Sequence, residues 1–206
     1  MAERLPMFPL GTVLAPFAGL PLHIFEPRYR VLMFDCVRGT PEFGVVLIER
    51  GLEVGGDDQR YHVGTVARIA DAGELPDGRW VVTAVGTDRI RILEWLPDDP
   101  YPVALVERLP TPAWDPADDD HRASAEREVR RALTLSGELG LEAPPATVEL
   151  AADPVVASWQ LVAIAPLGPF DKQQLLELDD PAARLLRLGE LAEEVSFLLA
   201  HRLRGE

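Results

Sequence analysis

The side chains that could carry catalytic chemistry are few in this sequence, and they do not form familiar catalytic patterns. Four histidines show neither i, i+4 helical spacing nor a His-Glu-x-x-His motif, which a helix-borne metal pair would need: His23, His62, His121 and His201. No serine stands in a Gly-x-Ser-x-Gly elbow, the turn that presents the nucleophile in many hydrolases. We therefore expect no catalytic residue, no metal and no cofactor, and keep an unrecognised hydrolase as a third alternative.

The one cysteine, Cys36, could act as a nucleophile with His23, which precedes the start of an expected helix. Cys36, however, recurs at helical spacing with Leu32 and Met33, and a buried cysteine usually behaves as a small hydrophobic residue. We interpret Cys36 as a packing residue. A single cysteine also excludes a disulfide within the chain and a cysteine-based zinc cluster.

Lys172 is the only lysine among 20 basic residues. A nucleotide-binding P-loop needs Gly-Lys-Ser/Thr, and Lys172 stands in Phe-Asp-Lys-Gln, so no such loop is present. Its helical, acidic surroundings predict no lowered pKa for a lysine nucleophile. Gly51, Gly55 and Gly56 lie in an acidic stretch with no helix start after them, so a glycine-rich phosphate cradle is not expected either.

Composition and charge indicate a folded protein and limit the kinds of partner that it can bind. With 206 residues and 47% hydrophobic composition, the chain should fold around a core. The net charge of −14 disfavours nucleic acid, whose binding needs clustered positive charge. Residues 111–206 contain 9 basic and 18 acidic residues, which makes this half the more acidic one. Without a signal-peptide pattern or a membrane-spanning apolar stretch, we expect a cytoplasmic protein with no membrane contact.

Up to residue 110 the pattern is that of a β-rich unit. Short runs of β-branched residues between Gly, Asp and Pro predict strands at 43–48, 63–69, 80–85, 89–93 and 103–106. A turn is predicted at Pro76–Gly78 and another at Gly86–Arg89. One helix should begin at Glu26–Pro27, continue to about Val37 and end at Gly39.

After a proline-rich linker at Pro110–Pro116, the apolar residues recur at the spacing of an α-helix. Three Asp-Pro pairs each combine a capping carboxylate with a proline suited to the first helical position, and they begin at Asp115, Asp153 and Asp180. Asp171 is predicted to cap a fourth helix. The last helix should bury one apolar face: Leu185, Leu188, Leu191, Val195, Leu198 and Leu199.

The segment from Pro16 to Pro27 is a candidate contact surface. It is an apolar, proline-punctuated stretch, which we interpret as a loop that either packs on the sheet or offers a patch to partners. Basic side chains follow it on the expected helix, namely Arg28, Arg30 and Arg38. Glu26 and Asp35 lie among them, so ion pairing within the chain is favoured over ligand contact.

The order of several motifs resembles the N-terminal substrate-binding domain of Lon, the ATP-dependent protease. The resemblance is densest in MFPLGTVL at Met7–Leu14 and in GLPLHIFEPRYR at Gly19–Arg30. It continues through Asp35–Cys36, Phe43–Val46, Val63–Ile69, Asp77–Arg79, Gly86–Arg89, Tyr101–Glu107, Asp171–Glu177 and Arg184–Leu185. One departure is local, because Ala15-Pro16-Phe17 stands where the family usually has Phe-Pro-Gly.

The resemblance implies an α+β fold, with a PUA-like β-barrel and one main helix in residues 1–110 and an α-helical bundle in 111–206. It implies a non-catalytic, proteolysis-related bacterial module that binds unfolded or degron-bearing polypeptide, as an adaptor or regulator with a protease as a further partner. Because the chain ends at Glu206, we expect a stand-alone protein, monomer or homodimer, without ATPase or peptidase activity. The predicted contact residues are Phe17, Leu20, Phe25, Glu26, Arg28, Tyr29 and Arg30. The alternative is an RNA-binding PUA-like module.

Overall fold

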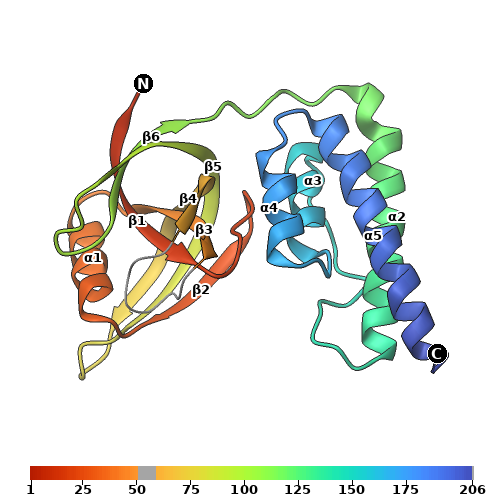
Figure 1. The fold of residues 1–206 in the computed structure, drawn as a ribbon, viewed down its shortest axis with the longest axis horizontal. Helices are drawn as coiled ribbons and strands as arrows, with labels where there is room; N and C mark the ends of the chain where they lie inside the picture. Colours follow the sequence, from red (N-terminus) through yellow and green to blue (C-terminus); the bar gives the residue numbers. More distant parts are fainter. Residues whose placement is uncertain (51–58, 206) are drawn as a thin grey trace. The chain divides into compact units, whose positions relative to one another are not determined.

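The chain divides into two units, Met1–Thr111 and Pro112–Glu206, in a computed structural model that describes residues 1–50 and 59–205 (Figure 1). Gly51, Gly55 and Gly56, considered above for phosphate binding, lie outside the described residues.

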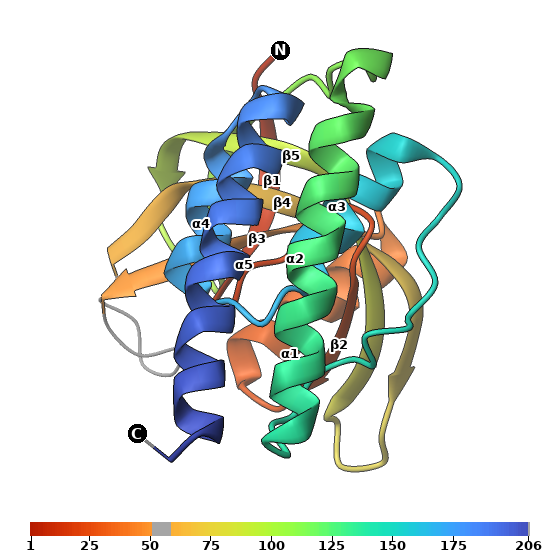
Figure 2. The ribbon, with the colours of Figure 1, turned by 90° about the vertical axis from the view of Figure 1, so that its right-hand side faces the viewer.

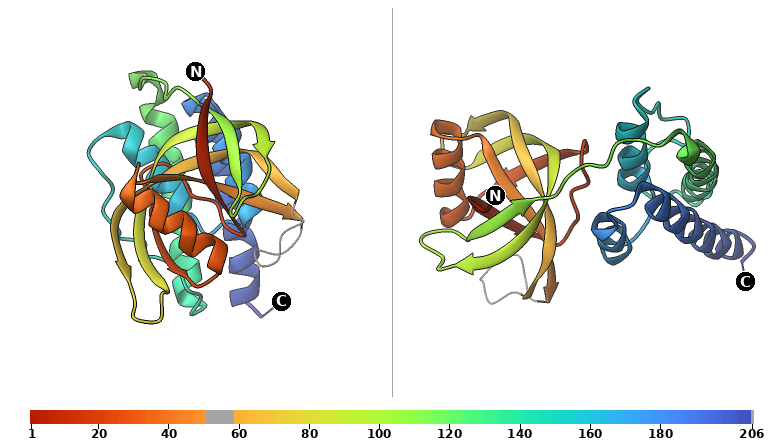
Figure 3. Two further views of the ribbon diagram at one scale, coloured as in Figure 1. Left: turned by 90° about the vertical axis from the view of Figure 1, so that its left-hand side faces the viewer. Right: turned by 90° about the horizontal axis from the view of Figure 1, so that it is seen from above.

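The first unit is a six-stranded mixed sheet that closes into a barrel (Figure 3). Its strands are β1 (Glu3–Leu10), β2 (Gly19–Ile24), β3 (Glu42–Arg50), β4 (Gln59–Glu74), β5 (Trp80–Leu96) and β6 (Val103–Arg108). They pair in the order β2-β5-β4-β3-β1-β6, and a further pairing of β5 with β6 joins the sheet to itself. Among the strand pairs of the described residues, only β1 and β3 run parallel. The described architecture, β-barrel followed by helices, is the α+β fold that was expected.

Strand β5 is longer than its sequence pattern predicted. The predicted turn at Gly86–Arg89 is wrong, because β5 continues through these residues with register shifts in its pairing with β4. Gly86 is needed for close approach rather than for a turn: a Cβ there would overlap the carbonyl oxygen of Ala15. Backbone hydrogen bonds from Phe17 to Gly86 (2.8 Å) and from Gly86 to Ala18 (2.9 Å) hold the two segments together.

The segment expected to be a loop, Pro16 to Pro27, contains strand β2, so that interpretation is wrong for its middle part. β2 pairs antiparallel with β5 from Gly19↔Val85 to Ile24↔Trp80. It stands at an end of the strand order, where Pro21 removes no hydrogen bond that a second neighbour would need. The sequence did not predict this strand, because Gly19 and Pro21 disfavour strand structure and weaken the alternation of apolar and polar residues.

Helix α1 (Pro27–Arg38) packs on the barrel through the stripe predicted for it, Tyr29, Leu32, Met33 and Cys36. It begins with a proline and ends at Gly39, as expected. Burial, followed by the charge of Asp35, raises the pKa of the Cys36 thiol to about 12, and the thiol donates a hydrogen bond to the carbonyl of Glu42. A thiol held protonated is a poor nucleophile, which supports a packing role for Cys36.

Residues 112–205 of the second unit form these helical segments: η1 (Pro116–Asp118), α2 (Asp119–Glu138), α3 (Pro154–Ile164), α4 (Pro169–Glu177) and α5 (Pro181–Leu203). The two long helices α2 and α5 lie side by side, and α3 and α4 lie behind them in Figure 2. Gly189 of α5 lies against the backbone of Ala125 in α2, which allows the two helices to approach closely.

The predicted caps are confirmed at three positions and wrong at one. The carboxylates of Asp115, Asp153 and Asp180 accept hydrogen bonds from the first backbone N–H groups of η1, α3 and α5. Asp171 is not a cap. Helix α4 begins earlier, at Pro169, whose fixed φ suits the first helical position, and Asp171 lies in its first turn.

Two predictions about side chains in the helical unit are also wrong. Leu198 is 64% exposed, although its apolar character placed it on the buried face. The buried stripe of α5 passes through Leu188, Ala192 and Ser196, and Leu198 comes two residues after Ser196, about 200° around the helix. The pKa of Lys172 is lowered by burial, since its ammonium packs onto the last turn of α3 and donates a hydrogen bond to the carbonyl of Ala163 (2.8 Å).

Candidate functional site

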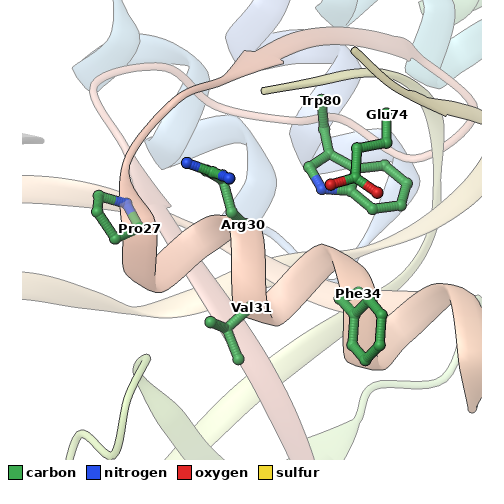
Figure 4. A pocket seen from close by; sticks show the side chains of 6 residues that line it. All are labelled: Pro27, Arg30, Val31, Phe34, Glu74 and Trp80. Carbon is green, nitrogen blue, oxygen red and sulfur yellow. The ribbon is translucent and has the colours of Figure 1, made fainter. Parts of the chain in front are cut away.

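A pocket of about 380 Å³ lies beside the outward face of α1 (Figure 4). Its lining comes from α1 and from the adjoining ends of β4 and β5: Pro27, Arg30, Val31, Phe34, Glu74 and Trp80. In Figure 4 the guanidinium of Arg30 and the carboxylate of Glu74 lie above the helix, with Val31 and Phe34 on its near side. The pocket therefore combines an apolar wall with one cation and one anion.

Helix α1 has two apolar faces, and only one of them is buried. Pro27, Arg30, Val31 and Phe34 follow i, i+3, i+4 and i+7 spacing, so they share the face turned away from Tyr29 and the other core residues. Val31 is 41% exposed and Phe34 is 44% exposed. Apolar side chains gathered at an open pocket in this way are typical of a surface that binds a partner.

The predicted turn at Pro76–Gly78 is confirmed, and it supports the pocket from the other side. Gly78 adopts a φ of +76°, and its N–H bonds the carbonyl of Leu75 (2.8 Å). A Cβ at Gly78 would overlap the guanidinium of Arg30, so the turn and the helix are in direct contact. The pairing of Glu74 with Trp80 at the base of this hairpin places both side chains beside α1.

The charges around the pocket are only partly paired as the sequence suggested. Arg28 forms the expected ion pair with Glu26 (3.3 Å) and lies over the ring of Tyr29, 4.5 Å from its centroid. Asp35 instead accepts a hydrogen bond from the hydroxyl of Tyr101 (2.8 Å). Burial and this hydrogen bond raise the pKa of Tyr101 to about 12.

The seven predicted contact residues are not all at one surface. Arg30 lines the pocket, and Glu26, Arg28 and the exposed Phe25 lie next to it in the chain. Leu20 and Tyr29 belong to the barrel core, where Tyr29 stacks on Phe8 with 4.1 Å between ring centroids. Their side chains are therefore not offered to a partner.

Phe17 is separated from the pocket by the length of β2. The strand's register places its start beside Val85 and its end beside Trp80, so Phe17 lies roughly 20 Å along the sheet from Phe25. Sequence reasoning missed five lining residues, namely Pro27, Val31, Phe34, Glu74 and Trp80. The helical spacing of Val31 and Phe34 with Arg30 was a usable signal, whereas Glu74 and Trp80 depend on a pairing between strands.

Phe17 has a φ of +62°, a left-handed conformation that glycine adopts without strain. Replacing Phe17 by glycine should therefore raise the free energy of unfolding by about 1 kcal/mol. The measurement is chemical denaturation of the wild type, Phe17→Gly and Phe17→Ala. Alanine removes the ring but keeps the strain, so it should show no gain. A glycine variant no more stable than the alanine variant would contradict the explanation.

Similarity to known proteins agrees with this architecture. The family model of the substrate-binding domain of the ATP-dependent protease La (Lon) matches residues 4–194, which include most of both units. The chain belongs to the Lon substrate-binding domain family. The resemblance noted in the opening motifs is thereby confirmed.

Bacterial Lon proteases are among the relatives of this Lon-type domain. It is 28% identical to the Lon protease of Trichlorobacter lovleyi, over 92% of this chain and 24% of that protein. It is 32% identical to the Lon protease of Phenylobacterium zucineum, over 98% of this chain and 25% of that protein. The chain thus spans about a quarter of the length of these relatives.

Solved structures show the same fold. The crystal structure of a Lon N-terminal domain protein from Xanthomonas campestris superposes with a TM-score of 0.64 and 28% identity, over 90% of this chain and 96% of that one. The N-terminal domain of the Mycobacterium avium complex Lon protease has a TM-score of 0.61 at 18% identity, over 93% of this chain and 99% of that one, and supports the fold.

A membrane-spanning helix and a metal-binding cluster are both absent from residues 1–50 and 59–205. No helix among these residues is long and apolar enough to cross a membrane. Within the same ranges, no group of three or more His, Cys, Asp or Glu side chains could hold a metal ion.

Proposed function

We propose that this Lon-type domain is a non-catalytic cytoplasmic module that binds unfolded or degron-bearing polypeptide at the pocket beside α1. The observation that carries the proposal is the outward face of α1, where Val31 and Phe34 are exposed beside a pocket while the opposite face is buried. Half-exposed apolar side chains at a pre-formed hollow can bury the apolar side chains of an extended chain.

The polar groups of the pocket suit a peptide backbone and its side chains. Arg30 offers guanidinium donors and Glu74 offers acceptors, so both kinds of backbone group find partners at the rim. We favour polypeptide over RNA because the chain carries a net charge of −14. In the family's context, we propose that the bound polypeptide is handed to or withheld from a protease, as an adaptor or regulator would do.

The test is the binding of fluorescein-labelled casein, an unfolded polypeptide, followed by the anisotropy of the fluorescein. The wild type should bind, and Val31→Ser with Phe34→Ser should weaken binding about tenfold or more, since two apolar contacts are lost. Arg28→Ala with Arg30→Ala should weaken binding less, by loss of rim contacts.

The matched control is Leu93→Ser, which removes an exposed apolar side chain of β5 outside the pocket lining. Its affinity for casein should equal that of the wild type. Absence of casein binding, or equal affinity in the wild type and in both double variants, would refute the proposed site.

A further inference from the structure

We propose that the outward face of α5 is a second binding surface, which takes a basic amphipathic segment of a partner protein. This surface belongs to the helical unit and is independent of the pocket beside α1. A pocket of about 590 Å³ lies on it, lined by Glu190, Glu193, Glu194, Phe197 and Leu198.

The geometry begins with two large apolar side chains that the helical unit does not cover. Phe197 and Leu198 are each 64% exposed. Leu186 is also exposed, and it lies on the same side of the helix as Phe197, because eleven residues make about three turns. The opposite side of α5 is the one that packs in the unit, through Leu188 and Ala192.

The charges around these apolar side chains indicate which kind of partner segment the surface would bind. Three carboxylates line the pocket, those of Glu190, Glu193 and Glu194. Arg187 is a neighbouring cation, with its guanidinium 3.0 Å from Glu190 and 3.9 Å from Glu194. The lining itself contains these three carboxylates and no basic side chain, so the pocket wall is negatively charged and complements Lys or Arg side chains in a partner.

A second copy of this chain is disfavoured by the same charges. A symmetric dimer through this face would bring the carboxylates of Glu190, Glu193 and Glu194 towards their counterparts. Residues 111–206 contain twice as many acidic as basic residues, 18 against 9, so other faces of the unit offer little compensation. A cationic segment with one apolar anchor between Phe197 and Leu198 satisfies both the apolar and the charged side chains.

The experiment uses the full chain and two fluorescein-labelled synthetic peptides with leucines at i, i+3, i+4 and i+7. One peptide carries lysine at its polar positions and the other carries glutamate. We expect the lysine peptide to bind, more weakly at higher salt, and the glutamate peptide not to bind. Phe197→Ser with Leu198→Ser should weaken binding at least tenfold, and Glu193→Gln with Glu194→Gln should weaken it several-fold and flatten its salt dependence.

Phe170→Ser and Glu138→Gln are the matched controls, since both residues are exposed on other helices of the same unit. Both should bind the lysine peptide as the wild type does. Equal binding of the two peptides would overturn the proposal, as would unchanged affinity in the Phe197 and Leu198 variant. A dimer in analytical ultracentrifugation that Phe197→Ser dissociates would overturn it in favour of a second copy.

Discussion

Replacing Arg184 by alanine should lower the stability of the helical unit by about 3 kcal/mol. Arg184 is a buried arginine of α5 whose guanidinium carbon lies 3.8 Å from the ring centroid of Trp159. It also donates hydrogen bonds to the carbonyl of Leu178 (3.3 Å) and to the hydroxyl of Ser158 (3.4 Å). Alanine would remove these two hydrogen bonds and open a cavity beside the indole. Chemical denaturation followed by far-UV circular dichroism measures the loss.

Arg187→Ala provides the comparison for Arg184, because Arg187 lies in the same helix but pairs with Glu190 in solvent. Exposed pairs contribute about 0.5 kcal/mol or less, so this variant should unfold close to the wild type. The summed tryptophan emission supplies a second measurement, which should change in Arg184→Ala but not in Arg187→Ala, because Arg184 lies against Trp159. Equal stability of the two variants would show that the buried arginine is not a structural element.

Replacing Arg108 by alanine should destabilise the barrel by about 2 to 3 kcal/mol. Arg108, on β6, donates hydrogen bonds to Glu3 (2.6 Å), Glu42 (2.7 Å) and Asp88 (2.7 Å). Its loss would leave three carboxylates near one another, and Glu42 is nearly buried. Arg68 pairs with Glu42 at 2.9 Å and would neutralise only one of them.

The same network predicts how stability depends on pH. Burial alone would raise the pKa of Glu42, but hydrogen bonds from Arg108 and Arg68 outweigh it and lower the pKa below its usual 4.5. A carboxylate with a lowered folded-state pKa stabilises the fold above its unfolded-state pKa, and this contribution is lost as pH falls through the folded-state value. Barrel stability should therefore decline below about pH 4.5, and Glu42→Gln should reduce that decline.

The control for Arg108 is Arg79→Ala. Arg79 makes an ion pair of the same length with Asp77 (2.7 Å), but both side chains lie in solvent. Its removal should leave the unfolding midpoint unchanged within error, since solvent and salt screen an exposed pair. Comparable losses in Arg79→Ala and Arg108→Ala would contradict the view that pairing with the buried Glu42 makes Arg108 stabilising.

Local features of the fold could be predicted where the signal is local. The helix from Pro27 to Arg38, its buried stripe and its end at Gly39 follow from proline geometry and from 3.6-residue periodicity. The Asp-Pro caps follow in the same way, because a carboxylate and the N–H groups it bonds are two or three residues apart. The failure at Asp171 has a local cause too, since Pro169 starts the helix first.

Features that depend on contacts between distant segments could not be predicted. The local sequence around Gly86 predicts a turn. In the barrel, the missing Cβ of Gly86 instead allows β5 to lie against the carbonyl of Ala15. The burial of Lys172 depends on the last turn of α3, which no pattern around the lysine reveals. The same holds for Trp80 and Glu74, which reach the pocket through strand pairing.

The sequence by itself determined the family, the α+β fold and the buried stripe of α1, because these reside in ordered motifs and in short-range periodicity. Tertiary structure alone decided which apolar side chains remain free for partners. Tyr29 and Leu20 were drawn into the core, while Phe34 and Phe197 remained at the surface. Burying any apolar side chain lowers the free energy of the folded chain. Which side chains are buried depends, however, on contacts with elements that are distant in the sequence.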